Sequence, residues 1–174
     1  RVHIVTRLDK DTSGLMLFAK HGYAHARMDK QLQQKSIKKH YYALVEGDTK
    51  LEEQGEIIAP IARDVDSIIT RRVHKSGKYA HTSYRLVADY GRVKLVDINL
   101  HTGRTHQIRV HMAYIGHPVA GDPLYGPRKT LKGHGQFLHA KTLGFTHPTT
   151  GELVEFTAEE PAIFKETLEK LREA

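Results

Sequence analysis

The 174-residue sequence lacks cysteine, and it has no continuous apolar run of about 18 residues. Without cysteine, the chain cannot form disulfide bonds, thiolate zinc sites or a cysteine nucleophile. Without a long apolar run it has no candidate membrane-spanning helix, and it shows no signal-peptide pattern of a charged region followed by an apolar one. We therefore expect a cytoplasmic protein with no membrane partner.

The composition is that of a basic, folded domain. Hydrophobic residues make up 39% of the chain and charged residues 27%, which is typical of globular proteins. Lysine and arginine outnumber aspartate and glutamate by 27 to 20, giving a net charge of +7. This excess favours polyanions such as nucleic acids as partners, although charge alone is equally compatible with a basic enzyme that binds none.

Chain length and the lack of repeats or low-complexity linkers predict a single domain over residues 1–174. The chain begins at Arg1 without an initiator methionine and reaches a dense polar motif almost at once. We interpret it as a fragment of a longer protein.

Apolar patterning predicts more strands than helices. Strands are expected over residues 41–46, 82–90, 93–100, 143–146 and 153–156, with short extended pieces over 57–60 and 67–73. The apolar run at residues 15–19 is typical of a buried strand. Turn residues at 91–92 and 148–151 join four of these strands into two hairpins.

Helical spacing of apolar residues predicts three helices. They are expected over residues 23–34, over residues 108–115, and after Pro161. Because hairpins outnumber strand–helix–strand units, the expected fold class is α+β, with a predominantly antiparallel mixed sheet flanked by a few helices.

Two segments carry candidate chemistry. The first is the polar stretch RLDKDTSG at residues 7–14, since loops held by a strand commonly carry reactive groups. An ordinary charged turn explains any single acid there equally well. The second is GRTHQIRVH, in which Arg104 and Arg109 are expected on different sides of a helix, one facing the sheet and the other solvent. A plain basic helix face is the alternative.

Considered together, these segments resemble the RluA/RluD-type pseudouridine synthases, a family of RNA-modifying enzymes. RLDKDTSGL is similar to that family's RLDxxTSGL signature, and KHYYALVEG to its K-x-Y-x-A-x-V-x-G strand. The third block of the family resembles GRTHQIRVHM and GHPVAGDPLYG, and its C-terminal hairpin resembles FLHAKTLGFTHPTTGE. The blocks occur in the family's order and cover nearly the whole chain.

The resemblance implies isomerisation of uridine to pseudouridine in structured RNA, without a metal ion or organic cofactor. Ribosomal RNA is expected ahead of transfer RNA, and the protein is expected to be a monomer. By the same resemblance, Asp9 is the catalytic carboxylate, Tyr41 stacks on the target base and Arg109 is the partner of Asp9. Arg7 would contact the RNA near the vacated base position, and Leu138 would help to wall the base pocket.

Two features depart from the family pattern. Thr6 stands where family members usually have histidine, so the family's RNA contacts at this position do not carry over to this chain. We expect that this fragment lacks the family's upstream strands and its frequent N-terminal RNA-binding domain, which leaves open whether the chain is active alone.

The chemistry independently requires these residue types. An ionised Asp9 could attack the sugar, attack the uracil ring, or remove the ribose 2′ proton, and the sequence does not choose among these routes. A fixed cation such as Arg109 would keep a buried carboxylate charged. Stacking on Tyr41 would contribute about 1–3 kcal/mol against the few kcal/mol that base extrusion costs. The Tyr41 phenol could also take the proton from carbon 5, and an ordinary core tyrosine is the alternative.

Basic side chains are the expected contacts for the RNA backbone, although each one taken singly fits a solvated surface residue better than an RNA contact. The candidates are Lys35, Lys38, Lys39, Arg71, Arg72, Lys75, Lys78, Arg104, Arg128, Lys129 and Lys132.

The sequence offers three rival interpretations. A metal site at His101, His106 and His111 is disfavoured, because a step of five residues separates side chains on a strand or a helix. Asp9 and Asp11 fit the DxDxT pattern of haloacid-dehalogenase-type phosphatases, but a hydrophobic strand should then precede Asp9. A non-catalytic RNA-binding or ribosome-assembly module remains the rival from another class.

Overall fold

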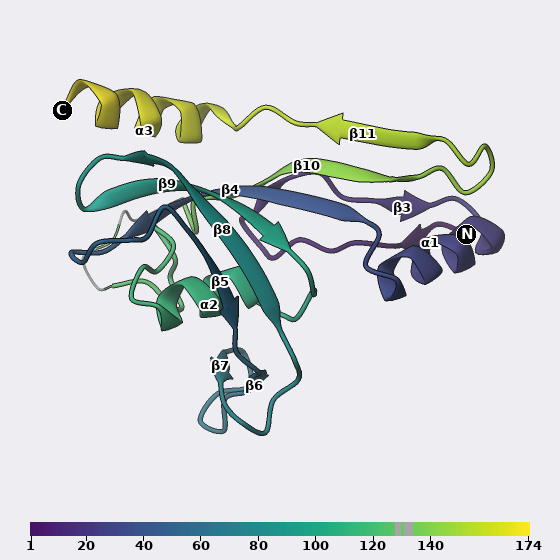
Figure 1. The fold of residues 1–174 in the computed structure, drawn as a ribbon, viewed down its shortest axis with the longest axis horizontal. Helices are drawn as coiled ribbons and strands as arrows, with labels where there is room; N and C mark the ends of the chain where they lie inside the picture. Colours follow the sequence, from purple (N-terminus) through teal and green to yellow (C-terminus); the bar gives the residue numbers. More distant parts are fainter. Residues whose placement is uncertain (128–129, 131–133) are drawn as a thin grey trace.

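The computed structural model describes residues 1–127, 130 and 134–174, and Figure 1 shows them arranged around one large twisted sheet. Within this part of the chain the main sheet has seven strands. Its order is β11-β10-β4-β9-β8-β5, and β2 lies beside β10. The strands are β2 (Ser13–Gly14), β4 (Lys38–Glu46), β5 (Gln54–Ile58), β8 (His81–Asp89), β9 (Val93–Leu100), β10 (Leu138–Thr146) and β11 (Leu153–Thr157).

Antiparallel pairing dominates this sheet. The pairs along the main path are antiparallel, and the short β2 pairs with β10 in parallel. Two small antiparallel ribbons accompany the sheet: β1 (His3–Ile4) pairs with β3 (Phe18–Ala19), and β6 (Ile61–Arg63) with β7 (Arg71–Val73). The expected α+β class, with an antiparallel-dominated mixed sheet, is confirmed.

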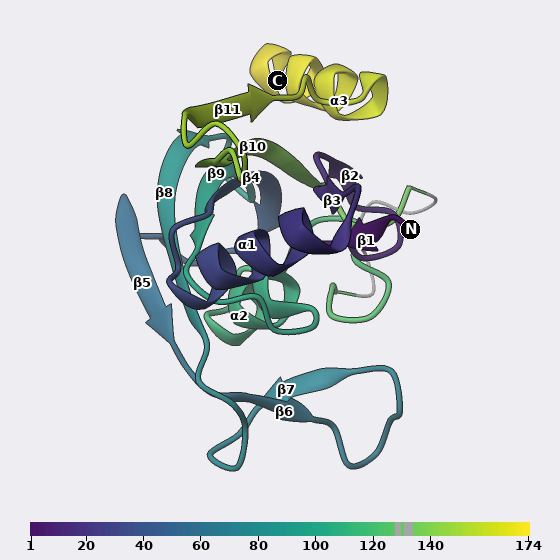
Figure 2. The ribbon, with the colours of Figure 1, turned by 90° about the vertical axis from the view of Figure 1, so that its right-hand side faces the viewer.

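The helices pack on the sheet from different sides (Figure 2). They are α1 (Gly22–Gln33), α2 (Gln107–Tyr114) and α3 (Ala162–Glu173). Strand β4 packs against helices on both faces of the sheet, because its successive side chains point to opposite sides. Ala43 packs in the cluster that contains Met112 of α2, whereas Leu44 packs with Phe164 of α3. No helix among the described residues is long and apolar enough to cross a membrane.

Both predicted hairpins are present. Strands β8 and β9 are joined by a turn in which Gly91 has φ +94° and its amide donates to the Asp89 carboxylate at 2.8 Å. Strands β10 and β11 form the second hairpin, and β10 begins at Leu138, earlier than the apolar pattern predicted.

The prediction of a buried strand over residues 15–19 is wrong. Only Phe18 and Ala19 form a strand, and Met16 and Phe18 are 38% and 47% exposed. The chain leaves the main sheet at Gly14, which has φ +111° and lies so close to β10 that a Cβ there would be 2.3 Å from the Ala140 carbonyl oxygen. The apolar run beyond this contact therefore forms an outer ribbon with β1 rather than a central strand.

Candidate active site

A cleft of about 570 Å³ opens between the loop that contains Asp9, strand β4 and the segment that precedes α2. This volume is typical of sites that take a small molecule or a single extruded nucleotide. The side chains named from the sequence that line the cleft are Thr6, Arg7, Asp9, Lys35, Lys38, Lys39, Tyr41, His101, Arg104, His106 and Leu138.

The loop that carries Asp9 is held by hydrogen bonds within the fold. The Thr12 amide donates to the Asp9 carbonyl at 3.0 Å, which closes a turn. The buried Gln136 amide donates to the Lys10 carbonyl and, at 3.0 Å, to the Thr12 hydroxyl. The Asp9 carboxylate is thereby placed at the cleft with its side chain 28% exposed. A ligand in the cleft can therefore reach it.

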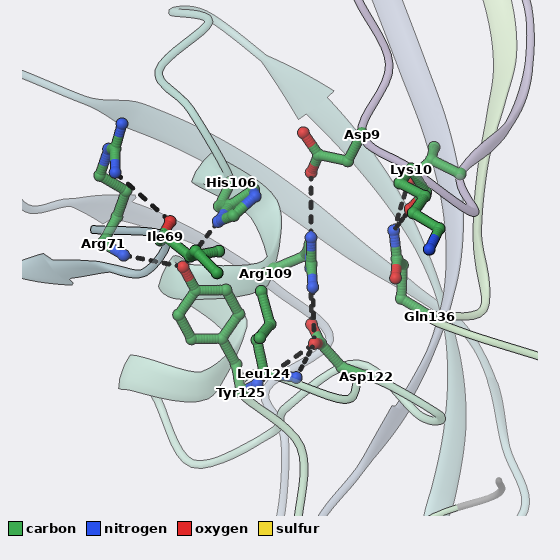
Figure 3. Close-up of polar contacts among 11 residues, drawn as sticks. Asp9, Lys10, Ile69, Arg71, His106, Arg109, Asp122, Leu124, Tyr125 and Gln136 are labelled. Atoms are coloured by element: carbon green, nitrogen blue, oxygen red, sulfur yellow. Dashed lines mark hydrogen bonds and ion pairs between the residues drawn. The ribbon is translucent and has the colours of Figure 1, made fainter. Parts of the chain in front are cut away.

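Arg109 lies behind Asp9 and joins two carboxylates (Figure 3). Its Nη1 atom is 3.6 Å from Asp9 Oδ2, and its side chain is only 4% exposed. Its Nε and Nη2 atoms each donate to the carboxylate of Asp122 at 2.8 Å. The structure therefore brings the predicted pair together, but the closer partner of the arginine is Asp122.

Asp122 was missed by the sequence analysis. It is 1% exposed, and its Oδ1 also accepts from the backbone amides of Leu124 and Tyr125 at 2.9 and 3.1 Å. The signal that could have found it is the segment GDPLYG, because an aspartate before proline commonly accepts hydrogen bonds from the following amides. That pattern still does not say which cation its carboxylate meets.

The charge of Arg109 is secured by its partners. Burial acts to lower the pKa of the guanidinium, but the hydrogen bonds and charge of Asp122, followed by the charge of Asp9, outweigh burial and raise the pKa. The Tyr125 ring also lies under the guanidinium, 5.3 Å from its central carbon. Arg109 is thus a permanently charged, fixed cation beside Asp9.

Tyr41 is 8% exposed on β4, and it lies both in the main hydrophobic core and at the cleft. Burial, and then the charge of Asp9, raise the pKa of its phenol to about 12. The phenol is consequently neutral at ordinary pH. Leu138, also buried, belongs to the same core cluster and lines the cleft beside it.

The raised pKa of Tyr41 predicts a loss of stability in alkali. The folded protein keeps this phenol protonated up to about pH 12, whereas an unfolded tyrosine ionises near pH 10. The free energy of unfolding is therefore unaffected by this phenol below about pH 10, and it falls by about 2–3 kcal/mol as pH rises to about 12. Urea unfolding of wild type and Tyr41→Phe from pH 8 to 11.5 should show that the free energy of unfolding falls less steeply with pH in the variant. The exposed Tyr114→Phe is the control, and a decline in Tyr41→Phe as steep as wild type would contradict the assignment.

The basic residues divide into two groups. Lys38, Lys39 and Arg104 line the cleft, and burial lowers the pKa of Lys39. Arg71 and Arg72 lie on β7, outside the residues that line the cleft, and Arg72 Nε finds no hydrogen-bond partner among the described residues. Lys75 and Lys78 also lie outside the residues that line the cleft. Arg128, Lys129 and Lys132 lie outside the described residues.

Arg104 is not on the helix. Helix α2 begins at Gln107, and Arg104 precedes it, with its Nε atom donating to the Tyr79 carbonyl at 2.7 Å. The prediction that Arg104 and Arg109 project from two sides of one helix is therefore wrong. The Gln107 side chain accepts from the Arg104 amide at 3.0 Å and so closes the turn that delays the helix start.

The three evenly spaced histidines have separate partners. His101 bonds to Ser83, His106 to Tyr125, and the buried His111 to Thr82 and the Ala59 carbonyl. They form no common site in the part of the chain that the structure describes.

A different group, Glu56, His81 and His101, brings potential metal-ligand atoms within 4.8 Å of one another. The two imidazole rings are stacked, with centroids 4.0 Å apart and planes 16° from parallel. In-plane lone pairs of stacked rings do not converge, so at least one ring would have to turn before both could bind one ion.

Comparison with known proteins identifies the family of this chain. A family model described as "RNA pseudouridylate synthase" matches residues 1–114, which is more than half of the chain. The chain belongs to this family. The match includes the Asp9 loop, β4 and helix α2, so it covers the elements that line the cleft except β10, which supplies Leu138.

Individual members of the RNA pseudouridylate synthase family agree with this assignment. The chain is 49% identical over 172 residues to the Bacillus subtilis "uncharacterized RNA pseudouridine synthase YlyB", covering 99% of this chain and 56% of that protein. It is 43% identical over 174 residues to ribosomal large subunit pseudouridine synthase D of Zymomonas mobilis, covering 92% and 53%. The chain thus spans about half the length of these relatives.

A solved structure shows the same fold. Human RNA pseudouridylate synthase domain containing 1 superposes with a TM-score of 0.79 at 26% identity, covering all of this chain and 81% of that one. The resemblance stated from the motifs is therefore confirmed at the level of family and fold. The roles of individual site residues stay predictions.

Proposed function

We propose that this family member isomerises uridine to pseudouridine within structured RNA, with Asp9 as the catalytic carboxylate. One observation carries the proposal: the Asp9 carboxylate faces a cleft from one side, while a buried guanidinium lies 3.6 Å behind it. Such a cation stabilises an ionised acid in a partly dehydrated site and fixes its orientation. Tyr41, in the same cleft, supplies an aromatic surface for an extruded base.

The reaction breaks the glycosidic bond, turns the uracil and joins its carbon 5 to the sugar. The ionised Asp9 serves any of three first steps: attack on the sugar, attack on the uracil ring, or removal of the ribose 2′ proton. Tyr41 and Leu138 hold the base in the cleft while it turns. Because the phenol of Tyr41 is neutral, it receives the carbon-5 proton only if it first gives up its own. Arg109 is a positioning residue, since it acts through Asp9.

Cations at the cleft would meet the RNA backbone. Arg7, Lys38 and Arg104 line the cleft, and their positive charges attract RNA phosphates whatever the base sequence. Ribosomal RNA is the substrate that we propose, because a relative at 43% identity is named for the ribosomal large subunit. We also propose that the protein acts as a monomer in the cytoplasm and needs no metal ion or organic cofactor.

Release of tritium from RNA labelled at carbon 5 of uridine tests the activity, because pseudouridine formation replaces that hydrogen. We expect the full-length protein to release tritium from an in vitro transcript of large-subunit ribosomal RNA, with or without excess EDTA once RNA folding is controlled. Binding of the transcript without tritium release would favour the non-catalytic module. The phosphatase alternative requires a predominantly parallel sheet, whereas the neighbours along the main sheet path here are antiparallel.

A further inference from the structure

His106 occupies an unusual backbone position at the cleft. It precedes helix α2 with φ 57° and ψ 21°, the left-handed region that residues other than glycine rarely adopt. Its side chain does not cap the helix, and it lines the cleft that contains Asp9. Strained positions of this kind persist where the surrounding contacts fix them, and they are common at functional sites.

A chain of hydrogen bonds favours one position for the hydrogen of the His106 ring. The Arg71 backbone amide lies 2.8 Å from the Tyr125 phenol oxygen, and that oxygen lies 2.7 Å from His106 Nδ1. A backbone amide can only donate, so the phenol oxygen accepts from Arg71 and its own hydrogen is free for Nδ1. When the phenol uses that hydrogen, a neutral His106 accepts at Nδ1 and carries its own hydrogen on Nε2. In Figure 3 the second ring nitrogen points away from Tyr125, on the side where Asp9 lies.

The charges that face His106 leave the ring neutral. Burial lowers the pKa of the imidazole, and the positive charges of Arg109 and Arg71 lower it further. The carboxylates of Asp9 and Asp122 act in the opposite direction, but the net shift is downward. The cleft therefore presents a neutral N–H donor rather than another cation.

We propose that His106 donates a hydrogen bond from Nε2 to a carbonyl oxygen of the extruded base, and that Tyr125 is the positioning residue that fixes this tautomer. This inference rests on the proposed uridine isomerisation. Uracil presents two carbonyl oxygens and therefore matches a neutral donor. Phosphates would be met instead by the cations at the cleft, Arg7, Lys38 and Arg104.

Two substitutions at the same position separate this role from a structural one. Asparagine tolerates the left-handed backbone and keeps a polar group near Nδ1, but it does not reach the position of Nε2. Glutamine carries an amide N–H out to about that position. With tritium release from the labelled ribosomal transcript, we expect His106→Asn to lower kcat/KM about tenfold, which corresponds to loss of one buried hydrogen bond. We expect His106→Gln to stay within about threefold of wild type.

Tyr125→Phe tests the positioning role. It keeps the ring against Arg109 but removes the hydroxyl that donates to Nδ1. We expect an intermediate loss in kcat/KM, and almost no additional loss when it is combined with His106→Asn, because Tyr125 acts only through the Nε2 donor that His106→Asn already removes.

The outcomes distinguish this inference from the activity on which it rests. No tritium release by wild type overturns the proposed function. An active wild type with an equally active His106→Asn overturns the role of His106 alone. Equal losses in His106→Asn and His106→Gln, each with a lowered melting temperature, would mean that the ring is needed only for folding, and would also overturn it.

Discussion

Asp9→Asn is expected to lower the rate of tritium release at least about 10³-fold, since catalytic proton transfer alone contributes about 10²–10⁴-fold and nucleophilic attack more. The amide keeps the size of the side chain but removes the negative charge that every proposed first step uses. The measurement is single-turnover tritium release from the labelled ribosomal transcript, with RNA affinity determined separately by filter binding.

Asp11→Asn is the matched control for this prediction. It makes the same chemical change two residues away, at an exposed position with φ 70° that asparagine tolerates. We expect the control to keep most of the wild-type rate and both variants to bind RNA. Tritium release by Asp9→Asn at the rate of Asp11→Asn would show that the carboxylate of Asp9 is not catalytic.

Asp122→Ala is expected to lower the free energy of unfolding by about 3–5 kcal/mol, the cost of leaving one member of a buried ion pair without its partner. Arg109 would lose both of its 2.8 Å hydrogen bonds, and of its two carboxylate contacts it would keep only the one with Asp9 at 3.6 Å. The amides of Leu124 and Tyr125 would lose their acceptor as well. Urea unfolding at neutral pH measures the effect.

Asp48→Ala provides the comparison for the buried pair. Asp48 and Arg92 form an ion pair at 2.6 Å, but both side chains are largely exposed, so its loss should change stability little. If Asp122→Ala is no more destabilising than Asp48→Ala, the buried pair does not support the fold as inferred.

A double substitution tests whether the cost arises from an unpaired charge. Arg109→Met combined with Asp122→Leu removes both charges, and apolar residues of similar volume often replace a buried ion pair with little loss. We expect the double variant to be less destabilised than the sum of the two single variants, and to be inactive because Asp9 has lost its cation. Additive losses would indicate that the two side chains contribute independently.

Local patterns predicted much of the fold, for reasons visible in particular elements. The alternation in β4 and in the β8–β9 hairpin was readable because successive strand residues face opposite sides and because Gly91 marks the turn. Helix α3 was readable from Pro161 and the spacing of Phe164 and Leu168. The run at residues 15–19 misled because apolar composition does not reveal whether a segment pairs inside a sheet or at its margin.

The candidate site was predictable only where a motif named its residues. Asp9, Tyr41 and Leu138 were taken from three separated blocks, and the structure brings all three to one cleft. The pairing of Arg109 with Asp122 and the contact of His106 with Tyr125 were not anticipated. Neither contact leaves a repeating pattern in the chain, because each depends on how the loop after α2 folds back.

The sequence by itself determined the family, the antiparallel character of the sheet and the acid on which the proposed chemistry depends. These follow from motifs and from side-chain periodicity, which are local properties of the chain. Only the tertiary structure decided that Arg109 is shared between Asp122 and Asp9, that burial raises the pKa of Tyr41, and that His106 lines the cleft in contact with Tyr125. Charge and hydrogen bonding depend on distance and burial in space, and the order of residues along the chain specifies neither directly.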